Sequence, residues 1–205
     1  MCWNAEVSLN TFIFGLISAA IVLAINKNEI NTVLFLLSVT SMQLLEYFAW
    51  KNINNKEAIK IISIVGMFLI LLQLILLNTL NLHGNERILI LIILFSVSLF
   101  AMVHIINNNK LKMYKAKNGH LAWIWADLPI PLLIVFFSLY LYSAIRNNEI
   151  IILFLIITLL SISLFSYYKY KTWGSMWCYI SNFFWLILIA KVIFEYYKKD
   201  LKKLI

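Results

Sequence analysis

Residues 149–168 read EIIILFLIITLLSISLFSYY, and this stretch decides the fold. Its apolar residues form an unbroken run, LFLIITLL at 153–160, without the alternation of apolar and polar residues that marks a strand of a membrane β-barrel. A transmembrane helix needs roughly 17–25 mostly apolar residues. The stretch is therefore long enough to cross a bilayer, and it predicts a membrane-spanning α-helix.

Six other stretches have the same character, and together the seven predict an all-α, polytopic membrane protein. Only short connections and tails remain between them, so we expect a single transmembrane bundle over residues 1–205 with no soluble domain. The seven predicted helices are 9–26, 31–50, 58–78, 87–106, 121–145, 149–168 and 173–197.

The composition supports this class of protein. Of the 205 residues, 63% are hydrophobic and 13% are charged, whereas soluble proteins average roughly 45–50% apolar and 25% charged residues. A soluble globular domain is excluded, and so is intrinsic disorder, which requires low hydrophobicity. The net charge is +8, but the basic residues lie in connections rather than in an aromatic-interleaved stripe. We therefore expect a lipid bilayer, and no nucleic acid, as the partner.

The distribution of lysine and arginine gives a weak preference for one orientation. With seven spans, the N-terminus shares its side with the connections that follow the second, fourth and sixth helices, including the longest one, 107–120. Those connections carry nine basic residues, and the opposite side carries seven, of which three lie in its short connections and four in the C-terminal tail. Because cytoplasmic loops are enriched in lysine and arginine, we expect the N-terminus to be cytoplasmic.

Tryptophan is concentrated at the N-terminal end of the predicted bundle. Six of the seven tryptophans map to this rim, and only Trp185 lies deeper. An aromatic belt should decorate both interfaces of a membrane protein, so a belt alone does not explain the bias. The six are Trp3, Trp50, Trp123, Trp125, Trp173 and Trp177.

Polar residues inside the predicted helices favour the same rim. Residues spaced by three, four or seven positions share one face of a helix, and a polar face directed at lipid would be costly. We therefore expect three such faces to converge on a cup that is floored by Asn182. The predicted cup consists of Gln43, Glu46, Trp50, Trp123, Asp127, Trp177 and Asn182, and the rim around it consists of Cys2, Trp3, Asn4, His120, Trp173, Ser175 and Cys178.

The two acidic members of the cup are open to two interpretations. A carboxylate inside the membrane is by default a hypothesis for a functional site, so Glu46 and Asp127 are candidate charge sites. Each also lies within about two turns of the rim, where a carboxylate can reach the headgroups or pair with a loop lysine.

The cysteines and prolines leave further alternatives. Cys2 and Cys178 are compatible with a disulfide or with buried thiols. Together with His120 they could also hold a metal ion, but the paired ligand spacing of known metal motifs is absent. We therefore expect no metal and no cofactor. Pro129 and Pro131 follow Asp127, and they predict either an ordinary kink or the broken helix found at many transporter sites.

A weak internal repeat suggests an arrangement of three helices, a linker helix and three helices. An offset of 123 residues aligns Ser38 with Ser161 and Trp50 with Trp173. Inverted or parallel repeats of this kind are found in many transporters.

Four short motifs resemble one protein family. MCWN at the N-terminus, the segment SMQLLEYFAW, GHLAW and GSMWC are similar to motifs in a family of multi-pass membrane proteins carried by Mimivirus-like large DNA viruses and some algae. Tyr179 stands where that pattern would have tryptophan. The resemblance implies a multi-pass location in a host membrane or an internal virion membrane, and it implies no catalytic residues.

Two functional hypotheses follow. The first is a small transporter or channel-like protein whose cup binds a polar or cationic solute. The second is a structural or assembly protein that docks a protein partner, or a second copy of itself, through the same rim. Ser175, Cys178 and His120 lack the spacing of a known nucleophile and base, so an enzyme is the less favoured class. A retinal protein is also not favoured, because Lys191 lies far in depth from Asp127 and is expected to extend toward the opposite rim.

Overall fold

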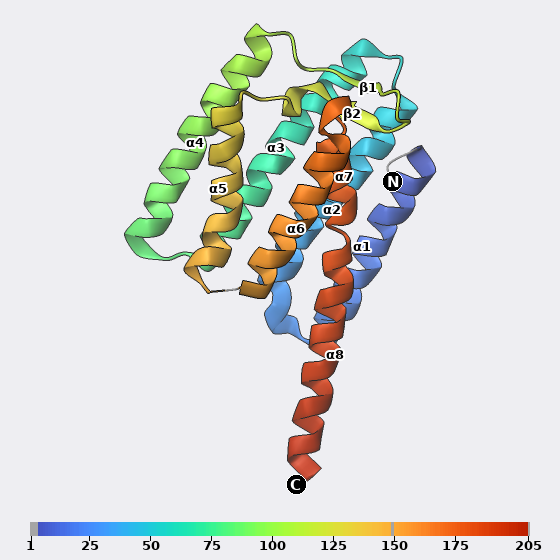
Figure 1. Cartoon of the computed structure of the whole chain (residues 1–205). Coiled ribbons are helices and arrows are strands. Elements are labelled where there is room, and N and C mark those ends of the chain that lie inside the picture. The colour runs from blue at the N-terminus through green and yellow to red at the C-terminus, as the bar shows by residue number, and fades with distance from the viewer. Residues whose placement is uncertain (1–3, 149, 205) are drawn as a thin grey trace.

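The computed structural model describes residues 4–148 and 150–204, and it is almost entirely helical (Figure 1). The described part contains eight α-helices, three short 3-10 turns and one two-stranded hairpin. The α-helices are α1 Ala5–Ile25, α2 Ile30–Lys51, α3 Lys56–Asn81, α4 Gly84–Asn107, α5 Ile130–Arg146, α6 Ile150–Tyr167, α7 Trp173–Ile180 and α8 Phe183–Leu204. The other elements are η1 Lys27–Glu29, β1 Met113–Lys115, β2 Leu121–Trp123, η2 Ile124–Ala126 and η3 Tyr168–Tyr170.

The helical membrane class predicted from the sequence is confirmed. Six segments are long and apolar enough to cross a membrane: Ala5–Ile25, Lys27–Lys51, Lys56–Leu80, Gly84–Asn107, Leu153–Tyr170 and Trp173–Lys198. The α5 helix is apolar but shorter, at 17 residues. The prediction of seven spans therefore stays a prediction.

The fifth predicted helix, 121–145, begins in the wrong place. Leu121–Trp123 forms strand β2, which pairs with β1 in antiparallel register so that Met113 lies opposite Trp123. Helix α5 begins only at Ile130, directly after Pro129. Proline disfavours the helical conformation of the residue before it and is tolerated in the first turn, where its missing N–H has no partner to lose. The two prolines thus start a helix instead of kinking one.

The last predicted helix, 173–197, is interrupted. Helix α7 ends at Ile180 and α8 begins at Phe183. At the interruption the Ser181 hydroxyl donates to the Trp177 carbonyl oxygen at 2.7 Å, and the Asn182 amide donates to the Cys178 carbonyl oxygen at 2.8 Å. These side chains occupy carbonyls of the preceding turn, which is how serine and asparagine compete with a helical backbone.

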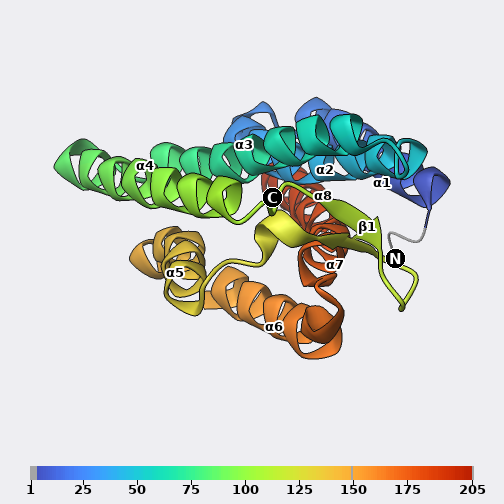
Figure 2. The same ribbon diagram turned by 90° about the horizontal axis from the view of Figure 1, so that it is seen from above.

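The helices form two layers. Seen end-on, α1 to α4 make one layer and α5, α6 and α7 lie on the other side, with the hairpin between them (Figure 2). The start of α1, the hairpin and η3 all lie at one end of the bundle, which we call the hairpin end, and α8 projects beyond the opposite end (Figure 1). Large apolar side chains such as Phe100, Phe154 and Phe165 are exposed on the outside, as expected for surfaces that face lipid.

Helices α1 and α2 approach each other closely at Gly15. A Cβ atom added there would lie 2.4 Å from Thr40 Cγ2, so only glycine fits without moving the α2 side chain. Overpacking a buried contact typically costs about 1–3 kcal/mol. We expect Gly15→Val to lower the midpoint of thermal unfolding in detergent, followed by intrinsic tryptophan fluorescence.

The matched control is Ala20→Val, which adds similar bulk at an exposed position of the same helix. Equal midpoints for the two variants would contradict the close α1–α2 contact.

Candidate functional site

A buried polar network holds α2 against the interruption between α7 and α8. The Thr40 hydroxyl donates to Asn182 Oδ1 at 3.1 Å, and the Trp185 indole N–H donates to Thr40 Oγ1 at 2.8 Å. All three side chains are buried. Interhelical hydrogen bonds of this kind favour association of membrane helices, so the network fixes where the interruption sits relative to α2.

Gln43 and Glu46 continue the same face of α2 toward the hairpin end. Both side chains have no exposed surface. Cys178 on α7 is also fully buried, and it forms no disulfide with a described residue. The structure thus places the cup residues Gln43, Glu46 and Asn182 and the rim residue Cys178 in the packed interior where α2 meets α7 and the start of α8.

Four tryptophans, at positions 123, 125, 173 and 177, line a different feature, an apolar cavity of about 130 Å³ between the two helix layers. Trp123 and Trp125 are buried, and their rings stack with centroids 5.1 Å apart. Gly174 leaves room for these rings, because a Cβ atom there would lie 2.9 Å from the Trp123 ring. Other lining residues include Ser98, Ala101, Ala126, Leu128, Phe136, Phe137, Trp173 and Trp177.

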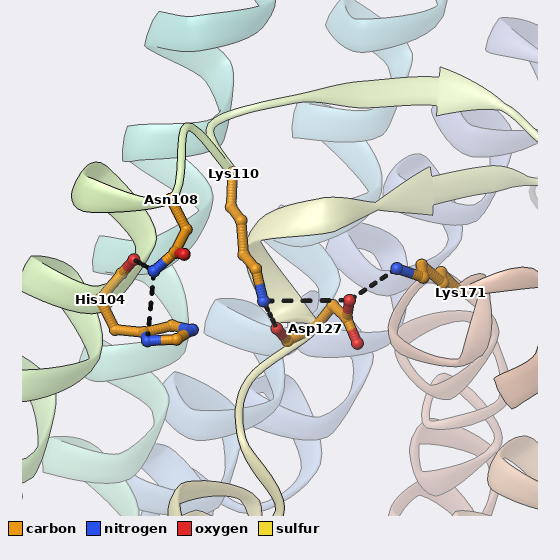
Figure 3. Close-up of polar contacts among 5 residues, drawn as sticks. All are labelled: His104, Asn108, Lys110, Asp127 and Lys171. Carbon is orange, nitrogen blue, oxygen red and sulfur yellow. Dashed lines mark hydrogen bonds and ion pairs between the residues drawn. The ribbon is translucent and has the colours of Figure 1, made fainter.

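The prediction that Asp127 and Trp123 share one face of an α-helix is wrong, because residues 121–129 form a strand, a 3-10 turn and a short connection. Asp127 follows η2 and pairs with two lysines (Figure 3). Its Oδ2 lies 2.7 Å from Lys171 Nζ and 3.9 Å from Lys110 Nζ, and Lys110 also donates to the Asp127 carbonyl oxygen at 2.5 Å. We call Lys110, Asp127 and Lys171 the lysine clamp. The alternative of pairing with loop lysines is the one that the structure adopts.

The remaining rim residues have structural surroundings. Asn4 caps α1, its side-chain oxygen accepting from the Val7 N–H at 2.9 Å. His120 is buried edge-on against the Tyr167 ring with centroids 5.4 Å apart, and burial lowers the pKa of its imidazole. Ser175 is buried on α7, and Trp50 is half-buried at the end of α2. Cys2 and Trp3 lie outside the described residues.

A second hollow, of about 400 Å³, lies between α1 and the α7–α8 interruption. Its lining is mixed and includes Asn10, Thr11, Tyr179 and Asn182. Asn10 and Asn182 could not be joined from the sequence, because their proximity depends on the packing of α1 against α8. The single predicted cup is thus divided among a buried network, an apolar cavity and a charged clamp.

The hairpin is held to the bundle by a contact that was not predicted from the sequence. Asn118 in the turn between β1 and β2 donates to Thr172 Oγ1 at 2.9 Å, and its own oxygen accepts from the His120 N–H at 3.3 Å. The Trp123 N–H donates to the Lys171 carbonyl oxygen at 3.3 Å. These bonds tie the hairpin to the start of α7. An asparagine before glycine is a turn signal, and it could have indicated the hairpin.

Neither metal-ligating groups in the described part of the chain nor known proteins indicate the chemistry of this site. Among the described residues, no group of three or more His, Cys, Asp or Glu side chains is placed to hold a metal ion. No protein-family model, curated protein or solved structure matches the chain. The resemblance to the viral and algal family therefore stays a prediction, and the function must be argued from geometry.

The Thr40 hydroxyl can be tested by substitution with valine, which has the same shape. Thr40→Val removes the acceptor of the buried Trp185 N–H, and an unsatisfied buried donor costs about 1–3 kcal/mol. We expect a lower unfolding midpoint than for Thr79→Val, whose hydroxyl bonds only the Ile75 carbonyl oxygen of its own helix. A Trp185→Phe background should abolish most of the difference, and an unchanged difference would exclude the network as its cause.

The lysine clamp predicts a specific pH dependence. The hydrogen bond to Asp127 raises the pKa of the Lys171 ammonium, so its stabilising contribution is present below the ordinary lysine pKa of about 10.4 and is lost as the pH rises through the raised value. We expect Asp127→Asn to be less stable than the wild type at pH 8, by at most about 1 kcal/mol because the pair is partly exposed, and the deficit should shrink at pH 11.

The control for the clamp is Glu57→Gln, an exposed carboxylate in the first turn of α3. A deficit of the same size at both pH values, or an equal one for Glu57→Gln, would argue against the clamp.

Proposed function

We propose that the protein is a multi-pass integral membrane protein of the transporter class whose ligand is apolar, taken from the bilayer into the cavity between the two helix layers. The observation that carries the proposal is the cavity itself, lined by four tryptophans and by aliphatic and phenyl side chains. A concave, mostly apolar hollow with a few polar groups is the usual form of a small-molecule site. An apolar cavity of about 150 Å³ can hold a ring the size of benzene, so this one suits a ring or a segment of a hydrocarbon chain.

The placement of the charged residues favours an apolar ligand over a hydrated ion. Neither Glu46 nor Asp127 lines the cavity. Glu46 lies in the α2–α7 interior, and the Asp127 carboxylate is occupied by the Lys171 ammonium. A polar solute would gain no charged partner in the cavity, whereas an apolar one gains contact with the tryptophan rings.

A few donors in the cavity wall indicate that the ligand also carries a hydrogen-bond acceptor. The buried indole N–H groups of Trp123 and Trp125 and the Ser98 hydroxyl have no acceptor in the described part of the chain. Buried donors left without partners are costly. An ester or carbonyl oxygen of a lipid-like molecule would satisfy one of them.

The proposed topology has seven crossings with the hairpin end and the N-terminus in the cytoplasm. Helix α5 runs between the same two ends of the bundle as its neighbours (Figure 1), and its 17 residues meet the lower limit of about 17 for a span. The lysines of the hairpin and η3 lie at the hairpin end, which agrees with the positive-inside rule. The arrangement of three, one and three helices is part of this proposal.

The ligand can be tested by quenching of tryptophan fluorescence with brominated acyl chains in detergent micelles. A chain inside the cavity meets the four tryptophans and quenches them. We expect Ser98→Phe, which places a ring in the cavity, to reduce the quenching. Ser96→Phe adds the same ring at an exposed position of α4 two residues away, and it should leave the quenching unchanged.

Two results would overturn the proposal. One is wild-type protein that brominated chains do not quench beyond the level of free tryptophan in the same micelles. The other is equal quenching in the two phenylalanine variants. Either would favour the alternative of an assembly protein that docks a partner at the hairpin end.

A further inference from the structure

The lysine clamp adjoins the wall of the apolar cavity. Asp127 stands between Ala126 and Leu128, both of which line the cavity, and Lys171 precedes the lining residue Trp173 by two positions. The three clamp side chains converge beside η2 at the hairpin end (Figure 3). A charged cluster and an apolar hollow thus share one short segment of backbone, and a ligand with two chemically different ends could reach both.

The clamp carries more positive than negative charge. Two ammonium groups surround a single carboxylate, which leaves one net positive charge at neutral pH. Each ammonium group has three N–H donors. Lys171 donates one hydrogen bond to the Asp127 carboxylate, and Lys110 donates one to the Asp127 carbonyl oxygen. Their side chains are 22% and 45% exposed for Lys110 and Lys171. Donors therefore remain for an anion that approaches from the membrane surface.

The depth of the clamp suits a lipid headgroup. It lies at the hairpin end with other lysines of the same loops, at 112, 115, 117 and 169. Exposed tyrosines at 114, 168 and 170 lie in the same elements, and tyrosine is enriched where membrane meets water. A lipid held at this level has its phosphate at the surface and its acyl chain directed into the bundle, which is the order of clamp and cavity.

We infer that the ligand of the cavity is a phosphate-headed lipid with one net negative charge. A segment of its acyl chain occupies the cavity, and its phosphate oxygens accept from Lys110 and Lys171. Lysine binds phosphate as a compact point charge, and a monoanion neutralises the net charge of the clamp. The inference rests on the proposed function and adds the headgroup class to it.

Three probes with the same brominated acyl chain separate the contributions of chain, phosphate and net charge. They are a lysophospholipid with a glycerol headgroup, which is a monoanion, the corresponding lysophosphatidylcholine, which is neutral overall, and a monoacylglycerol, which has no phosphate. We expect affinity to fall in the order monoanion, lysophosphatidylcholine and monoacylglycerol, with about tenfold between the first and the last, the size of one charge-assisted hydrogen bond. Inorganic phosphate serves as a fourth probe, and at millimolar concentration it should displace none of the chains.

The variant that tests the clamp removes all three charges together, as Lys110→Met, Asp127→Asn and Lys171→Met, so that no charge is left unpaired. It lowers the net charge by one. Lys115→Met changes an exposed side chain of β1. It lowers the net charge by the same amount and serves as the control. We expect the triple variant to bind the three brominated probes with equal affinity, and Lys115→Met to keep the preference for the monoanion.

The outcomes separate the two proposals. Equal affinity of the wild type for all three brominated probes, or a preference that persists in the triple variant, overturns the headgroup inference and leaves the apolar cavity intact. Competition by inorganic phosphate would assign the clamp to free phosphate instead of a lipid. Quenching that does not respond to Ser98→Phe overturns the proposed function itself. A thermal melt of the triple variant establishes that it folds before its affinity is compared.

Discussion

Backbone hydrogen bonding in a hydrocarbon environment is the constraint on which this structure depends. Every N–H and C=O group at membrane depth needs a partner within the protein, and the chain departs from helix in only a few places there. At one of them, Ser181 and Asn182 use their side chains to occupy carbonyls of the preceding turn. The longer departure, from Asn108 to Pro129, is placed at the hairpin end, where the β1–β2 ladder and the bonds to Lys171 satisfy it. Irregular backbone is therefore found where the protein supplies partners or water is near.

Packing and chemistry follow from that placement. Because the interruption between α7 and α8 is bonded to Thr40, α7 is fixed against α2, and the side of α7 that carries Trp173 and Trp177 faces the cavity. Trp123 of the hairpin and Trp125 of η2 line the same cavity. The segments in which the chain leaves the helical conformation thus also line the cavity, and their polar side chains lie in the α2–α7 interior or at the surface.

Sequence reasoning found the class and the helices whose apolar runs are continuous, because length and hydrophobicity alone decide those. It fails where local chemistry overrides hydrophobicity. Pro129 and Pro131 predict a kink or a break inside a helix, although proline is better suited to starting one, and Asn182 is predicted on a helical stripe that the structure interrupts. The error at 121–129 also displaces Asp127 from the site, since α-helical spacing does not apply to a strand and a 3-10 turn. The polar stripes of α2 and α7 do lie where these two helices pack together, but the separate apolar cavity depends on the layering of helices distant in sequence.

The projection of α8 has a mechanical consequence. Its 22 residues form a rod of about 33 Å at 1.5 Å per residue. The first half packs against α1 and α2 through the buried Leu188 and Val192, and the ion pair of Lys191 with Glu29 at 2.7 Å holds it there. The second half, beyond Val192, stands clear of the bundle (Figure 1) and is about 18 Å long at the same rise per residue. A tilt of about 10° where the two halves meet would displace the free end by roughly 3 Å, so a small rearrangement around Lys191 moves the far end of the helix on the opposite side of the molecule.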